Sequence, residues 1–489
     1  MRRLSVFAAV SSQPASEAFD FPAHDFTILR VSCLYEVVNV LVVALVVVGC
    51  GETRNEAVCC VSAEDCAAIG ADVLELACGE GLACRDHKCE VASCSTNGCS
   101  AEAPVCNVAT DTCEGCSSSS DCAQFVGAMS CDSSNGVCVE CLVSNDCPVD
   151  RAICDDHACR GCELDADCAS GACDEAMCVS EDRIAYVIPS GGSDAGSCTR
   201  VAPCATIQYA VTKTSSVVRH IVVAAGTYDQ DTRISTAETS APEVTIHGTG
   251  ATLTRTSGES EQFFVVNVKT TLVGLFFGPT ENTNSAIQCE DAPCRLRRIR
   301  LQRLGSIFPG PMMEIEDSDL DFILGSGVTL NNVTDSVKIT RTRLRGFVSG
   351  TGGVIDITNT MVLGEVSLPT GQGTIQFSTL ATSGGAGTGI EPRVVKAGPG
   401  VTLRDSIVWA GGTTQLPLGG GCTVTNSIVG PTAVPGASNV DPQFVSFSDF
   451  HLSANSPARD MASTGPGVDF EGEPRPVGAG FDLGADEVQ

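Results

Sequence analysis

The sequence predicts a mainly β protein in which a small disulfide-rich repeat region precedes a solenoid of stacked parallel β-coils. The first observation is that 22 of the 29 cysteines lie between Cys59 and Cys178. The second is that short windows with alternating apolar positions recur roughly every 20 residues beyond Ile184. The third is charge: residues 51–183 carry -20 of the total net charge of -30.

Length and composition restrict the classes of function. The chain has 489 residues, more than one compact core usually organises, so we expect two or three domains. It has 59 acidic and 29 basic residues, a balance opposite to that of nucleic-acid-binding proteins. Nucleic acid is therefore excluded as the main partner.

An apolar run near the N-terminus predicts export. Val37–Gly49 is almost entirely apolar, but it is shorter than the roughly 20 residues of a membrane-spanning helix, so it indicates the apolar part of a signal peptide. The sequence that ends the run, VVGC, resembles the lipobox of bacterial lipoproteins, which implies a signal peptide over residues 1–49 and a lipid on Cys50. The implied location is the bacterial cell envelope, at the outer membrane or cell surface, with membrane contact through the lipid. The alternative is a non-cleaved anchor.

The region from residue 50 to 183 consists of acidic, cysteine-rich repeats. Four of them begin with the spacing C-x4-D-C, and each ends with a second cysteine pair. Because the repeats follow an export signal, we predict disulfides rather than zinc ligands. Four cysteines allow three connectivities, so the pairing stays open. The predicted disulfide cysteines are Cys60, Cys66, Cys84, Cys89, Cys94, Cys99, Cys106, Cys113, Cys116, Cys122, Cys131, Cys138, Cys141, Cys147, Cys154, Cys159, Cys162, Cys168, Cys173 and Cys178.

An aspartate precedes the second cysteine in these repeats, as in Asp121, Asp146 and Asp167. We expect it to cap a turn by accepting hydrogen bonds from backbone N–H groups. The alternative is calcium binding, for which Glu163, Asp165 and Asp167 offer alternating carboxylates. No other cofactor is expected.

The windows of the solenoid also predict which residues stack. Aligning the windows that start at Cys294, Met313, Val337 and Ile355 places opposite charges on successive coils, which is favourable across neighbouring strands. The alternating columns are Arg295, Glu314, Lys338 and Asp356; Arg298, Asp317 and Arg341; and Arg300, Asp319 and Arg343.

Two segments at the ends of the solenoid carry family resemblances. Tyr186–Val211 together with Ile221–Gln230 resembles the opening of right-handed parallel β-helix proteins of the pectin-lyase-like class. This resemblance implies a β-helix over residues 184–438, a short helix covering one end, and a Cys198/Cys204 disulfide. The pieces DPQF, DFHL, SPA, RP and GADE between Asn439 and Glu487 resemble the choice-of-anchor Q module of bacterial β-helix proteins. That resemblance implies a C-terminal cap over residues 439–489, which we expect to close the apolar end of the solenoid.

We predict from these features a surface protein that binds or adheres to a polysaccharide or another cell-envelope component, without catalysis. The alternative is a polysaccharide lyase or hydrolase on the same scaffold, with Glu314, Glu316, Asp317 and Asp319 beside the arginines. Guanidinium groups on neighbouring coils could bind an acidic glycan. The predicted ligand face comprises Arg295, Arg297, Arg298, Arg300, Arg341 and Arg343.

Overall fold

The computed structural model describes residues 98–254, 262–278, 286–323, 325–382, 393–411, 416–446 and 449–489, with Cys94 and the backbone of two strands before it. The chain divides into two compact units, one ending at Val139 and the other beginning at Glu140. Cys50, Cys60 and Cys66 lie outside the described residues. Of Cys84 and Cys89, only the backbone is described.

Each cysteine-rich repeat contains a two-stranded antiparallel hairpin. The short 3-10 helix that precedes most hairpins begins after the first cysteine of the repeat. The hairpin strands are β1 (Leu82–Arg85) with β2 (Lys88–Val91), β3 (Val105–Asn107) with β4 (Thr112–Glu114), β5 (Ser130–Asp132) with β6 (Val137–Val139), β7 (Ile153–Asp155) with β8 (Ala158–Arg160), and β9 (Cys173–Asp174) with β10 (Met177–Cys178). The 3-10 helices are η2 (Ser119–Cys122), η3 (Ser144–Asp146), η4 (Val149–Arg151), η5 (Asp165–Asp167) and η6 (Glu181–Arg183).

The structure resolves the disulfide connectivity that the spacing left open. In each fully described repeat the first cysteine bonds the third and the second bonds the fourth. The C-x2-C pairs across repeat boundaries, such as Cys113 and Cys116, belong to different disulfides. The bonds are Cys94–Cys106, Cys99–Cys113, Cys116–Cys131, Cys122–Cys138, Cys141–Cys154, Cys147–Cys159, Cys162–Cys173 and Cys168–Cys178.

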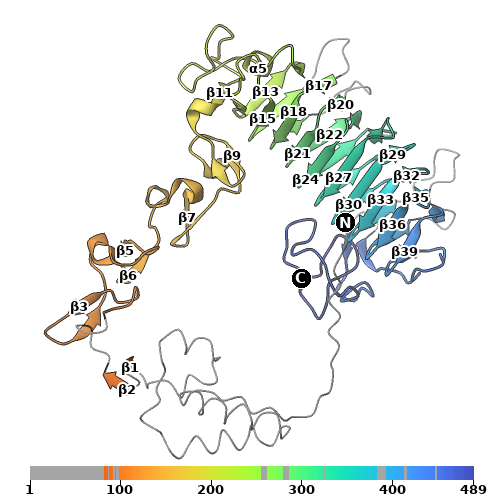
Figure 1. Cartoon of the computed structure of the whole chain (residues 1–489). Helices are drawn as coiled ribbons and strands as arrows, with labels where there is room; N and C mark the ends of the chain where they lie inside the picture. Colours follow the sequence, from red (N-terminus) through yellow and green to blue (C-terminus); the bar gives the residue numbers. More distant parts are fainter. Residues whose placement is uncertain are drawn as a thin grey trace, which may run out of the picture. The chain divides into compact units, whose positions relative to one another are not determined.

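A parallel β-helix follows, with one strand of each coil in each of three sheets (Figure 1). The first sheet contains β11 (Ile184–Val187), β12 (His220–Val223), β15 (Glu243–His247), β18 (Lys269–Val273), β21 (Cys294–Arg297), β24 (Met313–Glu316), β27 (Ser336–Thr340), β30 (Val354–Thr358), β33 (Gln372–Gln376), β36 (Val401–Arg404) and β39 (Thr423–Thr425). The second contains β13 (Gly226–Asp229), β16 (Ala251–Thr254), β19 (Phe276–Phe277), β22 (Arg300–Leu304), β25 (Asp319–Phe322), β28 (Arg343–Arg345), β31 (Met361–Leu363), β34 (Thr379–Thr382), β37 (Ile407–Ala410) and β40 (Ile428–Gly430). The third contains β14 (Thr232–Ile234), β17 (Gln262–Val266), β20 (Ala286–Cys289), β23 (Ser306–Phe308), β26 (Gly327–Leu330), β29 (Phe347–Gly350), β32 (Val366–Leu368), β35 (Arg393–Ala397) and β38 (Leu416–Gly420). The predicted fold class is confirmed.

The predicted register is confirmed for the four windows from Cys294 to Ile355. It is wrong for the next window, where the apolar spacing of Ile375 and Phe377 places Ile375 opposite Ile355, whereas the structure pairs Ile355 with Gly373 and Ile357 with Ile375. Arg295 pairs with Glu314, Glu314 with Lys338, and Lys338 with Asp356. The third positions of the four windows point inward, and with the later residues in register with them they form a buried column along the first sheet. This column consists of Leu296, Ile315, Ile339, Ile357, Ile375 and Leu403. Each coil thus buries one aliphatic side chain against the next, which supplies the hydrophobic stabilisation of the solenoid.

The turn from the first sheet to the second uses one residue with positive φ in most coils. This backbone conformation is uncommon outside glycine, and Asn and Asp tolerate it better than most residues. The column reads Arg298, Asp317, Arg341, Asn359, Phe377, Asp405 and Asn426. Asn359 and Asn426 thus belong to a column of left-handed turn residues, most of which are polar.

The short helix expected at the start of the solenoid is α5 (Ile207–Val211). The Thr206 hydroxyl caps it by accepting a hydrogen bond from Tyr209 N, and its side chains at Ile207, Ala210 and Val211 are buried. The Cys198–Cys204 disulfide forms, as does Cys289–Cys294. No helix in the described part of the chain has the length and apolar character needed to cross a membrane.

The C-terminal segment (Asn439–Gln489) packs differently from the expected end cap. It contains a short hairpin, β41 (Phe444–Ser446) with β42 (Asp449–Leu452). Its Leu452 and Leu483 pack on Ile407 and Ile428, which face outward from the second sheet. The end of the core is instead contacted by Val434 and Ala437, which precede the segment. The reason is the strand IVWA of β37, whose alternate side chains are apolar on both faces and therefore need a cover on the outside.

Candidate functional site

A groove of about 1340 Å³ lies between the last cysteine-rich repeat and the outward face of the first sheet. One wall consists of residues 162–164 and 173–180, in and directly after that repeat, and the other crosses β12, β15, β18, β21 and β24. Glu471 and Gly472 of the C-terminal segment also line it. Since neighbouring strands are about 4.8 Å apart, a groove that crosses several coils suits an extended ligand.

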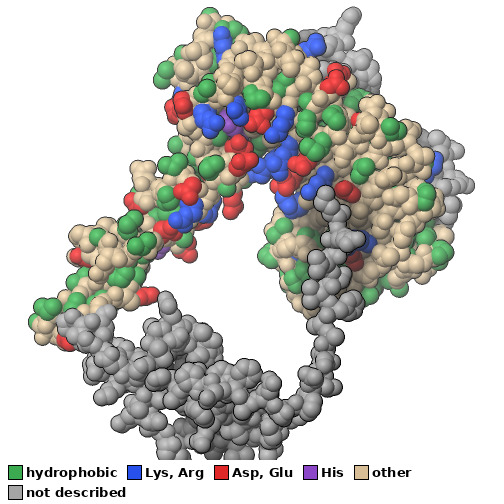
Figure 2. Space-filling model, in the orientation of Figure 1, with side chains coloured by type: hydrophobic (Ala, Val, Ile, Leu, Met, Phe, Trp, Pro, Cys, Tyr) green, Lys and Arg blue, Asp and Glu red, His purple; other side chains and the backbone are tan. Residues whose placement is uncertain are grey.

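The sheet wall of the groove carries closely paired charges. Glu243 accepts from Arg219 Nη1 at 2.9 Å and from Lys269 Nζ at 2.7 Å. Arg295 Nε lies 3.2 Å from Glu314 Oε2. Figure 2 shows Lys, Arg, Asp and Glu side chains gathered on this face of the solenoid. Of the predicted ladder, Arg295–Glu314, Asp317–Arg341 and Asp319–Arg343 form ion pairs between coils.

Glu316 holds several arginines together beside the groove. Its carboxylate oxygens lie 3.1 Å from Arg295 Nη2, 3.5 Å from Arg297 Nε and 2.9 Å from Arg341 Nη2. Burial acts to raise the pKa of Glu316, but the attraction of Arg295, Arg341 and Arg297 outweighs it and lowers the pKa below 4.5. Glu316 is thus a charged structural centre for three guanidinium groups.

A buried polar chain attaches the last repeat to the sheet. Asp165 Oδ1 lies 2.8 Å from His247 Nδ1, and His247 Nε2 lies 3.2 Å from His220 Nδ1. Burial, followed by the charge of His247, lowers the pKa of His220 to about 4, so it is neutral at pH 7. Arg298 Nη1 adds a hydrogen bond to the Glu163 carbonyl oxygen at 2.7 Å. These contacts position both walls of the groove.

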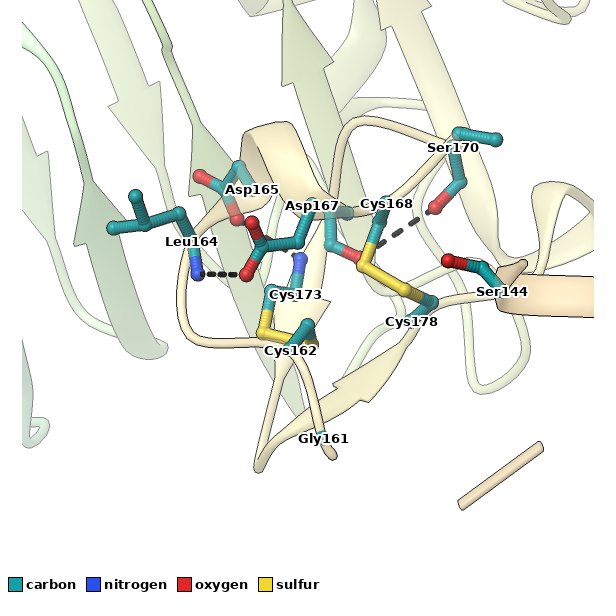
Figure 3. The surroundings of a disulfide bond; sticks show 12 residues. Ser144, Gly161, Cys162, Leu164, Asp165, Asp167, Cys168, Ser170, Cys173 and Cys178 are labelled. Carbon is teal, nitrogen blue, oxygen red and sulfur yellow. Dashed lines mark hydrogen bonds between the residues drawn. A yellow bond between two sulfur atoms is a disulfide. The ribbon is translucent and has the colours of Figure 1, made fainter. Parts of the chain in front are cut away.

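The predicted calcium residues have these structural partners. Asp167 Oδ2 accepts from the backbone N of Glu163 at 2.9 Å and of Leu164 at 3.1 Å. Asp165 Oδ1 accepts a hydrogen bond from Cys173 N at 2.9 Å (Figure 3). It is the same oxygen that contacts His247. Asp121 and Asp146 accept the same pair of backbone bonds in their repeats. The aspartate before the second cysteine of each of these repeats therefore caps a turn, as expected.

The structure separates the six arginines of the predicted ligand face. Arg295, Arg297 and Arg298 line the groove. Arg300 and Arg343 lie on the second sheet, where Arg300 stacks over the Phe276 ring with its guanidinium carbon 5.3 Å from the ring centroid. Arg341 pairs with Asp317 and Glu316.

Sequence reasoning missed three cations of the groove: Arg183, Arg219 and Lys269. The windows begin only at Cys294, so the three earlier coils of the first sheet are not aligned. The earlier coils do carry the apolar spacing of the later windows. Val244 and Ile246 occupy the first and third positions of one coil, and Thr270 and Leu272 pair with them in the next coil. Extending the register by two coils places Lys269 beside Glu243.

The groove is lined by both charged and aliphatic side chains. Among the described residues that line it, none is Trp, Tyr or Phe, so flat aromatic platforms for sugar rings are lacking there. Neither Arg183 nor Arg298 forms an ion pair with a described residue. A ligand carboxylate can therefore pair with either guanidinium without displacing a carboxylate of a described residue, while Arg298 Nη1 keeps its hydrogen bond to the Glu163 carbonyl oxygen.

The carboxylates considered for catalysis are all engaged by arginines. Asp319 is held in a bidentate pair by Arg343, with Nε–Oδ1 at 2.9 Å and Nη2–Oδ2 at 2.6 Å. Asp317 is paired with Arg341 and Glu314 with Arg295. No protein-family model matches the chain, and no curated protein matches it. The fold is a parallel β-helix, which is compatible with polysaccharide-related roles.

Proposed function

We propose that the protein binds an acidic polysaccharide in the groove between its last cysteine-rich repeat and the first sheet, and does not cleave it. The observation that carries the proposal is a groove that crosses successive coils and is lined by Arg183 and Arg298, neither of which pairs with a carboxylate among the described residues. A uronic-acid polymer supplies a carboxylate at regular intervals along an extended chain, which matches a regular stack of coils.

The lining favours a charged glycan over a neutral one. Neutral sugars are commonly held by stacking on aromatic rings, and the described lining residues include none. Planar guanidinium groups instead recognise carboxylates with two parallel hydrogen bonds. The ligand class is therefore set by charge and hydrogen bonding.

We favour binding over cleavage because the carboxylates that a catalytic site would use are already paired with arginines. A calcium-dependent lyase requires several carboxylates available to the metal, whereas Glu316, Asp317 and Asp319 are occupied by arginines. Using them for catalysis would first require breaking these ion pairs.

We further propose that the protein is held at the bacterial cell surface by a lipid on Cys50, with the acidic repeats as a spacer and the C-terminal segment as an anchor-Q-like module. The proposal rests on the apolar run that ends at Cys50 and on the motifs between Asn439 and Glu487. Labelling of the expressed protein with a radioactive fatty acid tests the lipid. Label should enter the wild type and not Cys50→Ser.

Binding and catalysis are separated by one pair of measurements. The full chain is mixed with labelled polygalacturonate and calcium. Binding is measured by the fluorescence polarisation of the labelled polymer. Cleavage is measured by the ultraviolet absorbance of the unsaturated products. We expect saturable binding without products. Product formation would show the lyase, and the absence of both signals would contradict the proposed function.

A further inference from the structure

A second pocket, of about 390 Å³, lies on the turns that lead from the third sheet back to the first. Its lining comes from three successive coils: residues 288–291 at the end of β20, residues 308–311 at the end of β23, and residues 331, 332, 334 and 335 after β26. It shares no lining residue with the groove. A pocket of this volume is large enough for a small ligand.

The covalent structure of the turns fixes the shape of this pocket. The Cys289–Cys294 disulfide closes the first turn. In the second turn Gly310 passes so close to the first that a Cβ at this position would lie 2.7 Å from the Cys289 carbonyl oxygen. Pro309 and Pro311 restrict φ on either side of that glycine. The first two turns are therefore held against each other before any ligand arrives.

Phe308 supplies an aromatic surface in the pocket. It is half-buried on the outward side of β23, between the buried Ile307 and Pro309, and it pairs with Gln288 on the neighbouring strand β20. Gln288 Nε2 donates to Glu290 Oε1 at 2.5 Å, which orients both polar side chains beside the ring. An aromatic face bordered by amide and carboxylate groups can hold the C–H face of a sugar ring and its hydroxyl groups together.

The third turn adds two amide side chains. Asp335 Oδ2 accepts from the backbone N of Asn331 at 3.1 Å and of Asn332 at 2.9 Å, which caps the turn. Both asparagines are exposed, and their side-chain amides form no hydrogen bond with another described residue. Each amide offers donors and an acceptor. A ligand hydroxyl, which both donates and accepts, is therefore a suitable partner for them.

The charge of the pocket is opposite to that of the arginines in the groove. Among the described residues that line the pocket, none is Lys, Arg or His, whereas Glu290, Asp291 and Asp335 are acidic. Like charges repel, so a uronic-acid carboxylate is disfavoured here. The groove has guanidinium groups and no aromatic ring among its described lining residues, and the pocket has the reverse composition.

We propose that this pocket binds a neutral sugar residue. The ring of Phe308 stacks on one face of the sugar, and the amides of Asn331 and Asn332 and the carboxylate of Asp291 bond its hydroxyl groups. The site does not depend on the binding of an acidic polysaccharide in the groove, because the two sites have no lining residue in common.

The test uses the full chain and fluorescence polarisation of labelled hexaoses of glucose, galactose and mannose. Dissociation constants are measured for the wild type, Phe308→Leu, Asn331→Ala/Asn332→Ala and the control Phe347→Ala. Phe347 is a half-buried phenylalanine of the same sheet that does not line the pocket. We expect at least one hexaose to bind the wild type and the control equally. Phe308→Leu and the double variant should raise its dissociation constant at least about tenfold.

Three results would overturn the sugar site. The first is a wild-type chain that binds none of the hexaoses, and the second is a loss in Phe347→Ala equal to that in Phe308→Leu. The third is tighter, salt-sensitive binding of a glucosamine hexamer, which would assign the pocket to a cation. Thermal unfolding identifies a variant that does not fold, and the other variant then decides. Binding of labelled polygalacturonate should be unchanged in Phe308→Leu, so failure of this site is distinguishable from failure of the groove.

Discussion

Arg475 illustrates, at the scale of single residues, how the C-terminal segment is held on the solenoid. Its guanidinium pairs with Glu487, donates to the carbonyl oxygens of Asp482 at 2.6 Å and Gly484 at 3.2 Å, and reaches Asn359 Oδ1 at 3.3 Å. Asn359 is one of the left-handed turn residues of the solenoid. One side chain therefore joins the segment to a coil.

We expect Arg475→Gln to lower the free energy of unfolding by about 3–5 kcal/mol, because it leaves Glu487 buried without its cation. Chemical denaturation followed by circular dichroism measures this loss. Arg459→Gln is the matched control, since Arg459 is in the same segment and donates to the Ala454 carbonyl near the surface. Equal effects of the two changes would contradict the structural role of Arg475.

Glu316 makes stability depend on pH. Its folded-state pKa lies below the usual value of 4.5, so its contribution is present above pH 4.5 and is lost as the pH falls through the folded-state pKa. We expect Glu316→Gln to cost about 1–3 kcal/mol at pH 7. The difference from the wild type should shrink toward zero below pH 4.5. A difference that is constant between pH 7 and pH 3 would exclude this origin.

At the scale of elements, the column of left-handed turn residues sets how each strand of the first sheet continues into the second. Asp405 has φ of 50° in this column, and its carboxylate accepts from Asn426 Nδ2 of the next coil at 2.6 Å. The short polar side chain therefore matches both the backbone and its neighbour.

We expect Asp405→Val to destabilise the solenoid by at least about 1–2 kcal/mol, because a β-branched residue is disfavoured at positive φ. Asp405→Gly removes the same hydrogen bond but tolerates the backbone, so it should cost less. Thermal unfolding of both variants measures the difference. Equal or reversed costs would show that the turn conformation is not limiting at this coil.

The elements also show what the sequence could predict. The charge columns predict the coil register for the four windows from Cys294 to Ile355, because a shift by one residue would turn apolar side chains outward. Beyond them charges are sparse, and the apolar spacing alone misplaces the next coil by two residues. The outward packing of the C-terminal segment could have been inferred from the two-sided apolar strand at Ile407. The disulfide connectivity could not, since all three pairings satisfy the same spacing.

At the scale of the whole second unit, the groove depends on contacts between residues distant in sequence. Asp165 and His247 are 82 residues apart, and the sequence around either residue gives no indication that the two side chains are in contact. The three arginines of β21 and its turn were predictable as an exposed row, whereas the opposite wall was not. The last repeat thus forms one wall of the groove, which its cysteine spacing alone does not suggest.

The central claim, binding of an acidic polysaccharide in the groove, is tested most directly by the dissociation constant for a labelled galacturonate oligomer. The full-length wild type is compared with the double variant Arg183→Gln/Arg298→Gln, which removes two groove cations that form no ion pair with described residues. Arg300→Gln, on the second sheet, is the control. We predict that the double variant raises the dissociation constant at least about tenfold, or 1.4 kcal/mol, and that the control leaves it unchanged. An unchanged constant in the double variant, or an equal loss in the control, would contradict the claim.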